Sequence, residues 1–257
     1  MNEISPLWGI CSFKSIKDNL IACRAKNRLP QNAKSVVVAC FPYLLEEENY
    51  KNANVSKYAV VTDYHEVVLN RLEKACEKLQ KNFPENSFVP FADNSPIPEV
   101  SAAVLAGLGV KGMNSLLITE KYGSYVFIGE IVTDLETDCT ESEIRNCIGC
   151  KKCISACPSG ALDSEKFIRE ICLSEITQRK GELTEKEIEL MKSCGCVWGC
   201  DICQDACPMN RNSEKTDITE FLSSPAGKVD EGCPLEGRAY EWRGRKVIER
   251  NILIHKK

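Results

Sequence analysis

The 257-residue sequence lacks any apolar run that approaches the length of a membrane span, which argues against a membrane-spanning protein. Its start, Met-Asn-Glu-Ile-Ser-Pro-Leu-Trp, also lacks the basic segment and the apolar stretch of a secretory signal. Positive charge is not in excess either: a net charge of −4 gives no overall electrostatic case for binding nucleic acid. With 43% hydrophobic and 27% charged residues, the chain is typical of a globular protein rather than a disordered or collagen-like one.

What the sequence has in abundance is cysteine, with sixteen residues. In a short secreted protein this number would predict disulfides, but about half of these cysteines fall in spacings typical of metal clusters. We interpret the others as reduced thiols and expect a cytoplasmic protein. These other thiols are Cys11, Cys23, Cys40, Cys76, Cys139 and Cys233.

Two cysteine motifs carry the strongest functional signal. The first reads C-I-G-C-K-K-C-I-S-A-C-P, the C-x2-C-x2-C-x3-C-P spacing with which bacterial ferredoxins hold [4Fe-4S] clusters, and its fourth cysteine normally serves a second cluster. The second, shorter motif reads W-G-C-D-I-C-Q-D-A-C-P. Exchange of the fourth cysteines between the motifs assigns one cluster to Cys147, Cys150, Cys153 and Cys207. The other cluster takes Cys157, Cys200 and Cys203 and needs one more ligand, for which Cys172, Cys194 and Cys196 are candidates.

Paired C-x2-C motifs also occur in zinc ribbons, and zinc is the alternative interpretation. Four cysteines followed by three, with two Cys-Pro endings, fit zinc poorly. The spacing therefore favours two [4Fe-4S] clusters.

Ahead of the cysteine motifs, about 135 residues alternate between strand and helix patterns, which predicts an α/β or α+β domain. We predict strands at Ser35–Phe41, from Phe88 up to a turn at Asp93, at Ser115–Ile118 and at Tyr125–Thr133, and helices from Asp63 and at Ser101–Ala106. The polar segment Glu46–Ser56 is predicted to be a surface loop. His65, in the first turn of the first helix, is interpreted as a capping or solvated histidine, since no metal partner lies at helical spacing.

The rest of the chain is expected to follow an acidic junction at Asp134–Arg145. Helices are predicted at Asp163–Gln178 and Thr184–Lys192, and the basic tail is interpreted as a solvated helix, with phosphate contacts as the alternative. The basic residues of the tail are Arg238, Arg243, Arg245, Lys246, Arg250, Lys256 and Lys257. The expected domains are residues 1–138, 139–215 and 216–257.

Two further features are open to more than one interpretation. Asp93 follows a strand, where α/β proteins often place chemistry, but Asp-Asn-Ser-Pro is also a good turn on its own. The segment Gly107–Gly112 matches G-x-G-x-x-G, yet it follows a predicted helix and precedes a strand, which is the wrong context for dinucleotide binding. Its glycines are expected to permit a tight turn or the approach of a large planar ligand.

Taken together, these segments resemble the epoxyqueuosine reductase family, cobalamin-dependent iron–sulfur enzymes that complete the queuosine modification of tRNA. The resemblance runs from about Val36 to Asn251. It is carried by Tyr58–His65, Ala92–Glu99, Ala106–Ile118, Gly123–Glu130, Trp198–Asn210 and the first cysteine motif. It implies a nitroreductase-like N-terminal domain that holds cobalamin, followed by a bacterial-ferredoxin-like domain with two [4Fe-4S] clusters.

The resemblance also assigns individual residues. Cys172, in Cys-Leu-Ser-Glu-Ile-Thr, becomes the missing cluster ligand. Asp93 becomes the general acid, and we expect it in an apolar pocket between Phe91 and Pro96, where burial would raise its pKa. The implied cofactor-binding residues are Asp93, Gly109, Gly112, Asn114 and Ser115.

The sequence departs from the family at three places. Val100 and Met113 stand where the family has Arg and Lys, which removes two cations near the expected pocket. Arg250-Asn251 resembles the start of the family's helical-repeat extension, which helps to hold tRNA, but the sequence stops at Lys257. We therefore expect a short form that binds tRNA weakly.

The leading hypothesis is a corrinoid-dependent reductase in which two [4Fe-4S] clusters pass electrons from reduced ferredoxin or flavodoxin to cobalamin. One alternative is a two-cluster electron-transfer protein, a ferredoxin fused to a docking domain without substrate chemistry. The other is an enzyme resembling reductive dehalogenases, which share the corrinoid and cluster plan but usually carry a twin-arginine signal that this sequence lacks.

Overall fold

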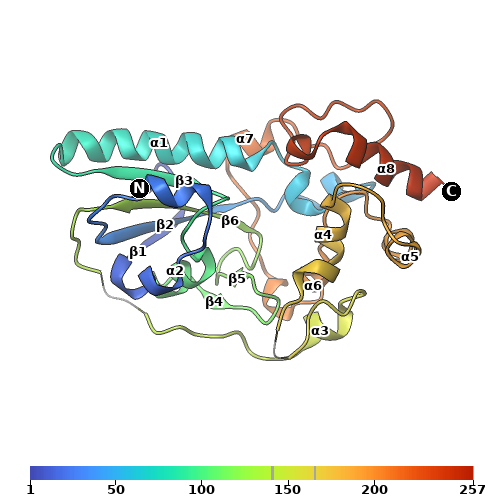
Figure 1. Cartoon of the computed structure of the whole chain (residues 1–257), viewed down its shortest axis with the longest axis horizontal. Coiled ribbons are helices and arrows are strands. Elements are labelled where there is room, and N and C mark those ends of the chain that lie inside the picture. Colours follow the sequence, from blue (N-terminus) through green and yellow to red (C-terminus); the bar gives the residue numbers. More distant parts are fainter. Residues whose placement is uncertain (140–141, 165, 257) are drawn as a thin grey trace. The chain divides into compact units, whose positions relative to one another are not determined.

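A computed structural model describes residues 1–139, 142–164 and 166–256 (Figure 1). Residues 140–141 of the expected junction and Lys257 of the expected tail lie outside the described residues. The chain divides into two compact units, and neither is continuous in sequence. The first comprises Met1–Pro42 and His65–Cys147, and the second Tyr43–Tyr64 and Ile148–Lys257.

This division differs from the three domains expected from the sequence. The excursion Tyr43–Tyr64 belongs with the second unit because its backbone bonds to segments far along the chain: Ser56 N–H donates to Trp198 O (2.8 Å) and Thr216 N–H donates to Leu44 O (2.8 Å). The residues after 216 are also part of the second unit rather than a separate tail.

Besides three short 3₁₀ helices, the first unit contains six strands and two α-helices among its described residues: β1 (Leu7–Ser12), β2 (Ser35–Pro42), α1 (Tyr64–Asn82, which begins at the boundary), β3 (Phe88–Ala92), α2 (Glu99–Leu105), β4 (Val110–Lys111), β5 (Leu117–Ile118) and β6 (Val126–Thr133). The described part of the second unit contains α3 (Lys152–Ala156), α4 (Leu173–Gln178), α5 (Glu185–Cys194), α6 (Ile202–Asp205), α7 (Thr219–Leu222) and α8 (Arg245–Lys256).

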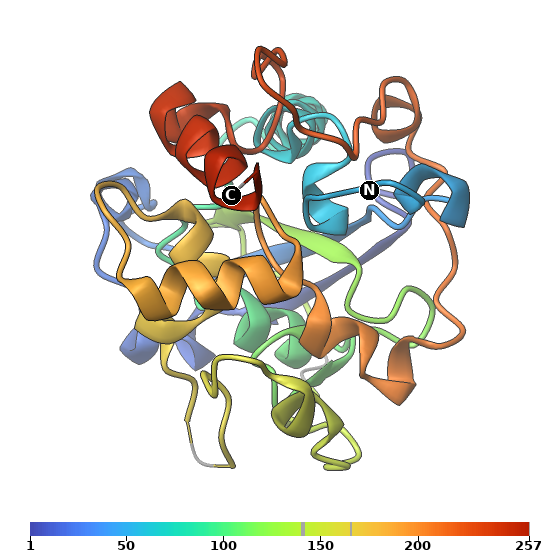
Figure 2. The same ribbon diagram turned by 90° about the vertical axis from the view of Figure 1, so that its right-hand side faces the viewer.

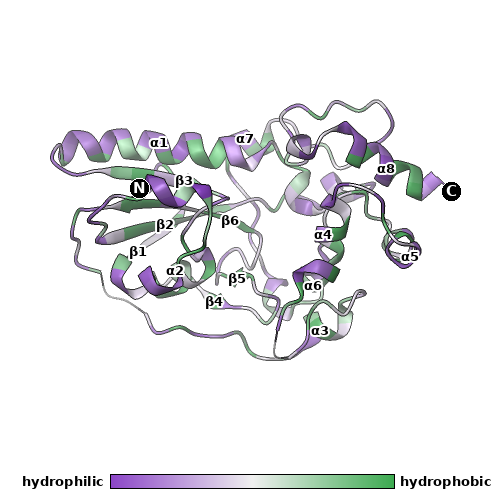
Figure 3. Cartoon of the chain, viewed as in Figure 1, coloured by the Kyte–Doolittle hydropathy of each residue, from purple (hydrophilic) through white to green (hydrophobic). Residues whose placement is uncertain are grey.

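An antiparallel sheet with the order β1-β2-β6-β3 forms the centre of the first unit. The apolar run S-V-V-V-A-C-F-P of β2 is buried along its whole length, as expected for a strand with both faces covered. Figure 3 shows the hydrophobic strands beneath α1, whose surface alternates between hydrophobic and hydrophilic bands. The predicted mixed α/β class and the predicted strands at β2, β3 and β6 are confirmed; the likeness to nitroreductases stays a prediction.

The two helices cover opposite faces of this sheet (Figure 1). Gly129 of β6 faces α1, because a Cβ built there would lie 2.7 Å from Val68 Cγ1 and 2.8 Å from Leu72 Cδ1. The next residue, Glu130, points to the other face, where α2 contacts β1, β2 and β6. A glycine on the central strand thus lets α1 approach the sheet closely.

The second unit has a small helical core in which α4, α5 and α8 contact one another (Figure 2). The predicted start of α5 is confirmed: Thr184 and Glu187 form a capping box, each side chain bonding to the other's backbone N–H. The tail forms a helix, α8, as predicted, but one face of it is buried rather than solvated. On that face Asn251 donates to Thr177 O (2.7 Å) and Val197 O (2.8 Å). These bonds join α8 to the core of the unit.

Several predicted elements are wrong in extent. Residue 165 of the helix predicted over Asp163–Gln178 lies outside the described residues. The described residues of that range are α-helical only at α4, after a 3₁₀ turn at Arg169–Ile171, because Cys172 adopts an extended conformation between them. The predicted surface loop Glu46–Ser56 ends in buried backbone: Val55 forms a bridge with Trp198. The predicted strand Ser115–Ile118 is reduced to β5, and β1 was not anticipated.

No helix within the described residues is both long and apolar enough to span a membrane.

We expect Gly129→Ala to destabilise the protein, because the added methyl group overlaps Val68 and Leu72, both fully buried. Overpacking of this kind costs about 1–3 kcal/mol, which anaerobic thermal unfolding would detect as a Tm lowered by several degrees. The matched control is the same change in a Leu72→Ala background, where the removed side chain leaves room. If Gly129→Ala costs as much there as alone, close packing of α1 is not the reason for the glycine.

Candidate functional site

Six of the eight predicted cluster cysteines lie on or beside two short helices of the second unit that contact each other, α3 and α6. On α3, Cys153 is buried, while Cys150 is exposed in the preceding loop. That loop turns tightly because Gly149 and Lys151 adopt left-handed conformations, with φ of 67° and 58°. The three cysteines at the other helix are Cys200, Cys203 and Cys207, all half-buried. The helix pair thus presents thiols from both motifs within one unit.

The other two predicted ligands lie elsewhere in the chain. Cys147 is the last residue of the first unit, where its N–H donates to Lys111 O (2.9 Å). Cys172 is the N-cap residue of α4 in the second unit. Its pKa is raised mainly by burial, and the nearby thiolate of Cys157 adds to the increase. The structure therefore brings the candidate fourth ligand near a predicted ligand of the same cluster.

The two remaining candidates for this fourth position lie close by. Burial raises the pKa of Cys200, and the thiolates of Cys196 and Cys203 add to the effect, so these three sulfurs are neighbours. The thiol of Cys196 donates to Cys194 O at 3.6 Å. Cys196 therefore remains an alternative to Cys172 as the fourth ligand of this cluster.

Within residues 1–139, 142–164 and 166–256, no three His, Cys, Asp or Glu side chains converge to hold a single metal ion. The ligands of a cubane bind separate iron atoms, so a cluster does not require such convergence. Seven thiols in two ferredoxin-type motifs, together with Cys172 as the candidate eighth ligand, fit the donor chemistry of [4Fe-4S] clusters.

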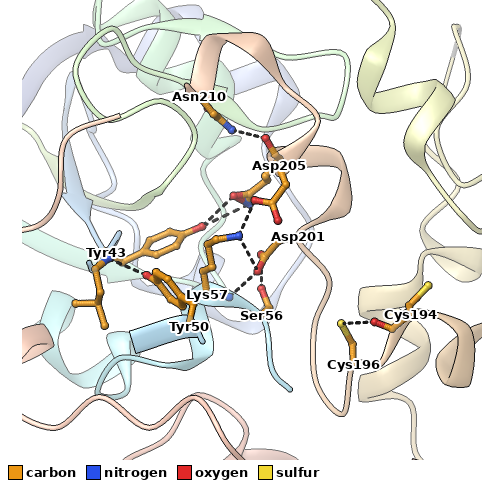
Figure 4. A network of polar contacts seen from close by, with 11 residues as sticks. Tyr43, Tyr50, Ser56, Lys57, Cys194, Cys196, Asp201, Asp205 and Asn210 are labelled. Atoms are coloured by element: carbon orange, nitrogen blue, oxygen red, sulfur yellow. Dashed lines mark hydrogen bonds and ion pairs between the residues drawn. The ribbon is translucent and has the colours of Figure 1, made fainter. Parts of the chain in front are cut away.

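A network of polar contacts holds the second cysteine motif in place (Figure 4). The carboxylate of Asp201, next to Cys200, accepts a hydrogen bond from Ser56 Oγ (2.5 Å) and one from the backbone N–H of Lys57 (2.6 Å). Lys57 Nζ also lies 4.0 Å from Asp201 Oδ2 and 2.6 Å from Asp205 Oδ1. Burial raises the pKa of Asp201, while Lys57, Ser56 and the Lys57 N–H partly oppose this shift.

Further contacts extend this network along the motif. The Tyr43 hydroxyl donates to Gln204 Oε1 (3.2 Å), and Trp198 Nε1 donates to the Tyr58 hydroxyl (2.7 Å). Gly199 has a φ of 74°, and a Cβ there would collide with Ser56. Hence the Asp and Gln of the motif bind the excursion Tyr43–Tyr64 and fix the loop that presents the cysteines.

Asp93 lies in a strained turn between β3 and α2. Asp93 and Asn94 both adopt left-handed conformations, with φ of 53° and 37°. Two consecutive non-glycine residues of this kind are unusual, and such strain is common at functional sites. One carboxylate oxygen of Asp93 lies 3.1 Å from His65 Nε2. The prediction of a capping or solvated His65 did not include this contact with Asp93.

The predicted apolar pocket around Asp93 is wrong. Phe91 and Pro96 are buried, but the Asp93 side chain, in its left-handed turn, is 55% exposed. The buried environment that was expected for Asp93 surrounds two other carboxyl groups instead. Burial, followed by the charge of Asp93, raises the pKa of Glu99 to about 7. Burial, and then the charge of Glu99, also raises the pKa of Glu130 well above its ordinary value.

Glu130 was missed by the sequence analysis. It is fully buried, and neither of its carboxyl oxygens has a hydrogen-bond partner of normal geometry. A charged residue inside the apolar run Y-V-F-I-G-E-I-V-T was the available signal. Asp93, Glu99 and Glu130 together form a group that we call the carboxylate cluster.

The predicted cofactor-binding residues at β4 and β5 have local structural roles. A Cβ at Gly109 would collide with Ile118 O, and one at Gly112 with the side chain of Asn114. Asn114 Oδ1 accepts from Leu116 N–H (3.4 Å), and Ser115 takes a φ of 65° at the hairpin turn. The hairpin itself accounts for the local conformation of these four residues, and their role in binding a cofactor stays a prediction.

Comparisons with known proteins give two family matches. Residues 146–210 match a 4Fe-4S double cluster binding domain, and residues 24–94 match the epoxyqueuosine reductase QueG domain DUF1730. The epoxyqueuosine reductase of Listeria monocytogenes is 34% identical over 245 residues, and that of Lactococcus garvieae 30% over 221 residues. These alignments cover 88% and 81% of this chain, and 63% and 62% of the relatives, so the chain spans less than two thirds of their length.

Solved structures show the same fold. An epoxyqueuosine reductase from Streptococcus thermophilus matches with a TM-score of 0.80 at 24% identity, covering 99% of this chain and 78% of that one. An epoxyqueuosine reductase in complex with an epoxyqueuosine-modified tRNA stem loop matches with a TM-score of 0.79 at 24% identity and the same coverage. A catabolic reductive dehalogenase matches with a TM-score of 0.54 at 17% identity, covering 98% of this chain and 34% of that one.

We expect Asp201→Asn to loosen the second cysteine motif. The asparagine amide cannot accept the hydrogen bonds from Ser56 and Lys57 together, and Lys57 loses a largely buried ionic partner. Breaking a buried pair costs about 3–5 kcal/mol, so cluster absorbance should decay faster in air and the Tm should fall. The matched control is Asp205→Asn: the Asp205 side chain is 51% exposed, and its ion pair with Lys57 should contribute about 0–1 kcal/mol. Equal effects of the two substitutions would contradict this assignment.

Proposed function

The chain belongs to the epoxyqueuosine reductase family, and on that premise we propose that it is an oxidoreductase that reduces a strained C–O bond in a queuosine-type substrate with electrons from two [4Fe-4S] clusters. The observation that carries the catalytic part is the strained turn that presents the Asp93 carboxylate beside His65 and the carboxylate cluster. Strain of this kind persists only where the surrounding structure enforces it, and function is a common reason.

The chain's own residues would act as follows. Asp93 donates a proton to the oxygen that leaves the substrate, and its exposed position lets it reach a bound substrate. His65, 3.1 Å away, orients the carboxylate. The eight cysteines hold the clusters, which supply single electrons from a donor such as reduced ferredoxin or flavodoxin.

Cobalamin is the second cofactor that we propose. Support comes from the family and from the fold shared with a reductive dehalogenase whose structure suggests a mechanism for B12-dependent dehalogenation. When bound, a corrinoid would supply low-valent cobalt as the reductant. Anaerobic reconstitution with cobalamin, read by absorbance and EPR, tests this part. If the washed protein retains no corrinoid, the electron-carrier alternative is favoured.

The substrate that we propose is an epoxyqueuosine nucleotide in tRNA, because a relative of the same fold binds such a stem loop. Turnover of an epoxyqueuosine-containing stem loop by the reconstituted protein is the direct assay. A protein that reduces an aryl halide but not the stem loop would favour the alternative that resembles reductive dehalogenases.

We predict about eight iron atoms per chain, because the seven cysteines of the two crossed motifs, together with Cys172, imply two [4Fe-4S] clusters. Cys172→Ala should halve the iron content and remove one cluster from the EPR spectrum of the reduced protein. Cys194→Ala is the matched control and should keep both clusters. The opposite pattern would move the fourth ligand to the second motif, and a zinc-loaded protein would end the cluster proposal.

We predict that Asp93→Asn lowers turnover by roughly 10²–10⁴-fold, the usual contribution of a general acid. Asparagine tolerates the same left-handed turn, so both clusters and the cofactor content should be retained. Asp18→Asn, an exposed aspartate in the same unit, should leave turnover unchanged. Normal turnover in a fully loaded Asp93→Asn protein would remove Asp93 from the mechanism.

A further inference from the structure

The carboxylate cluster extends from the core of the first unit to its surface. Glu130 lies on the central strand β6, paired in register with Val38 of β2 and Phe91 of β3, and it is fully buried. Glu99 is half-buried in the first turn of α2, and Asp93 is exposed in the turn between β3 and α2. Three acids therefore form a series of decreasing burial that ends at the proposed proton donor.

A purely structural role does not explain Glu130. Among the described residues, no Lys or Arg pairs with Glu130 or with Glu99, and neither Glu130 oxygen has a hydrogen-bond partner of normal geometry. An isolated carboxylate in such a place is costly and takes up a proton instead. A leucine or methionine would fill the same space without that cost, so the carboxyl group calls for another explanation.

The groups that face this cluster are few. The buried thiol of Cys40 on β2 is one of them. Burial is the main cause of the raised pKa of Cys40, and the charge of nearby Glu130 adds to it. From the turn before α2, the Ser95 hydroxyl partly opposes the rise in the pKa of Glu130. From α1, His65 contacts Asp93. In the part of the chain that the structure describes, no facing group supplies a fixed positive charge to the two inner acids.

The proposed reaction requires more protons than Asp93 alone can hold. Reduction of an epoxide to an alkene breaks two C–O bonds, forms one C=C bond and releases the oxygen as water, which consumes two electrons and two protons. The electrons come singly from a low-potential donor through the clusters. Asp93 can give one proton and must be reprotonated before it gives the second.

We propose that Glu99 and Glu130 form a proton store behind Asp93, in which Glu99 returns a proton to Asp93 within each turnover and Glu130 resupplies Glu99. This inference rests on the proposed function and assigns the source of the second proton. With a pKa of about 7, Glu99 is about half protonated at neutral pH and exchanges its proton readily, while Glu130 stays neutral.

The store can be tested without turnover. In the holoprotein without substrate, difference infrared spectroscopy should show protonated-carboxyl bands at neutral pH. One band should fade as the pH rises through about 7 and be absent in Glu99→Gln, and another should persist and be absent in Glu130→Gln. Asp93→Asn should lower the pKa of the Glu99 band, because the Asp93 charge helps to raise it. If neither band exists, the inference is overturned even where the enzyme is active.

Turnover gives the second test. Glu99→Gln should lower the multiple-turnover rate by roughly 10–100-fold with unchanged cluster content and KM, and the rate should lose its decline above pH 7. A small acid such as imidazolium should restore part of the rate, and Glu99→Asp should be intermediate. Glu120→Gln, which alters an exposed acid of the same unit, is the matched control and should behave as the parent protein.

The outcomes separate the two proposals. A Glu99→Gln protein with an unchanged pH profile and no response to imidazolium would overturn the proton store while the proposed function stands. A parent protein that reduces no epoxide but shows both carboxyl bands would overturn the proposed function, and with it the use that we assign to the stored protons.

Discussion

The second unit depends on the contact between a buried aspartate and the backbone of a distant segment. Asp201 accepts from Ser56 and Lys57, and this joins the loop of the second cysteine motif to a segment that precedes it by about 145 residues. A cluster loop has little apolar surface of its own, so its shape must come from such directed bonds. The Lys57 charge, shared between Asp201 and Asp205, also offsets part of the negative charge that thiolate-bound clusters bring to this unit.

Some of this arrangement could be predicted from the sequence, because it depends on local signals. The cysteine spacing identified the cluster domain, apolar runs identified β2 and β6, and the Thr184 capping box identified the start of α5. The excursion Tyr43–Tyr64 could not be assigned to the second unit in this way. Its polar composition resembles a surface loop, and its partners are separated from it by well over one hundred residues.

The candidate site shows the same limit. Position after a strand, together with family resemblance, pointed to Asp93, but the environment predicted for it was wrong, because its side chain is exposed in a left-handed turn that the sequence did not reveal. The burial that raises the pKa of a carboxyl group and so keeps a proton on it is found at Glu99 and Glu130 instead. Glu130 was visible as a charge in an apolar strand, whereas its closeness to Glu99 follows only from the packing of α2 against the sheet.

The interleaved order of the two units has a consequence for how the protein is made. Residues Tyr43–Tyr64 leave the ribosome early, yet the partners of Ser56 and Lys57 follow about 145 residues later. At ordinary synthesis rates of about 5–20 residues per second, that delay is roughly 7–30 seconds. During this interval the excursion lacks its bonding partners, while the sheet of the first unit, whose strands precede and follow the excursion in the sequence, can already form. The contacts that hold the loop of the second cysteine motif can therefore form only late in synthesis, after the first cysteine motif has already been made.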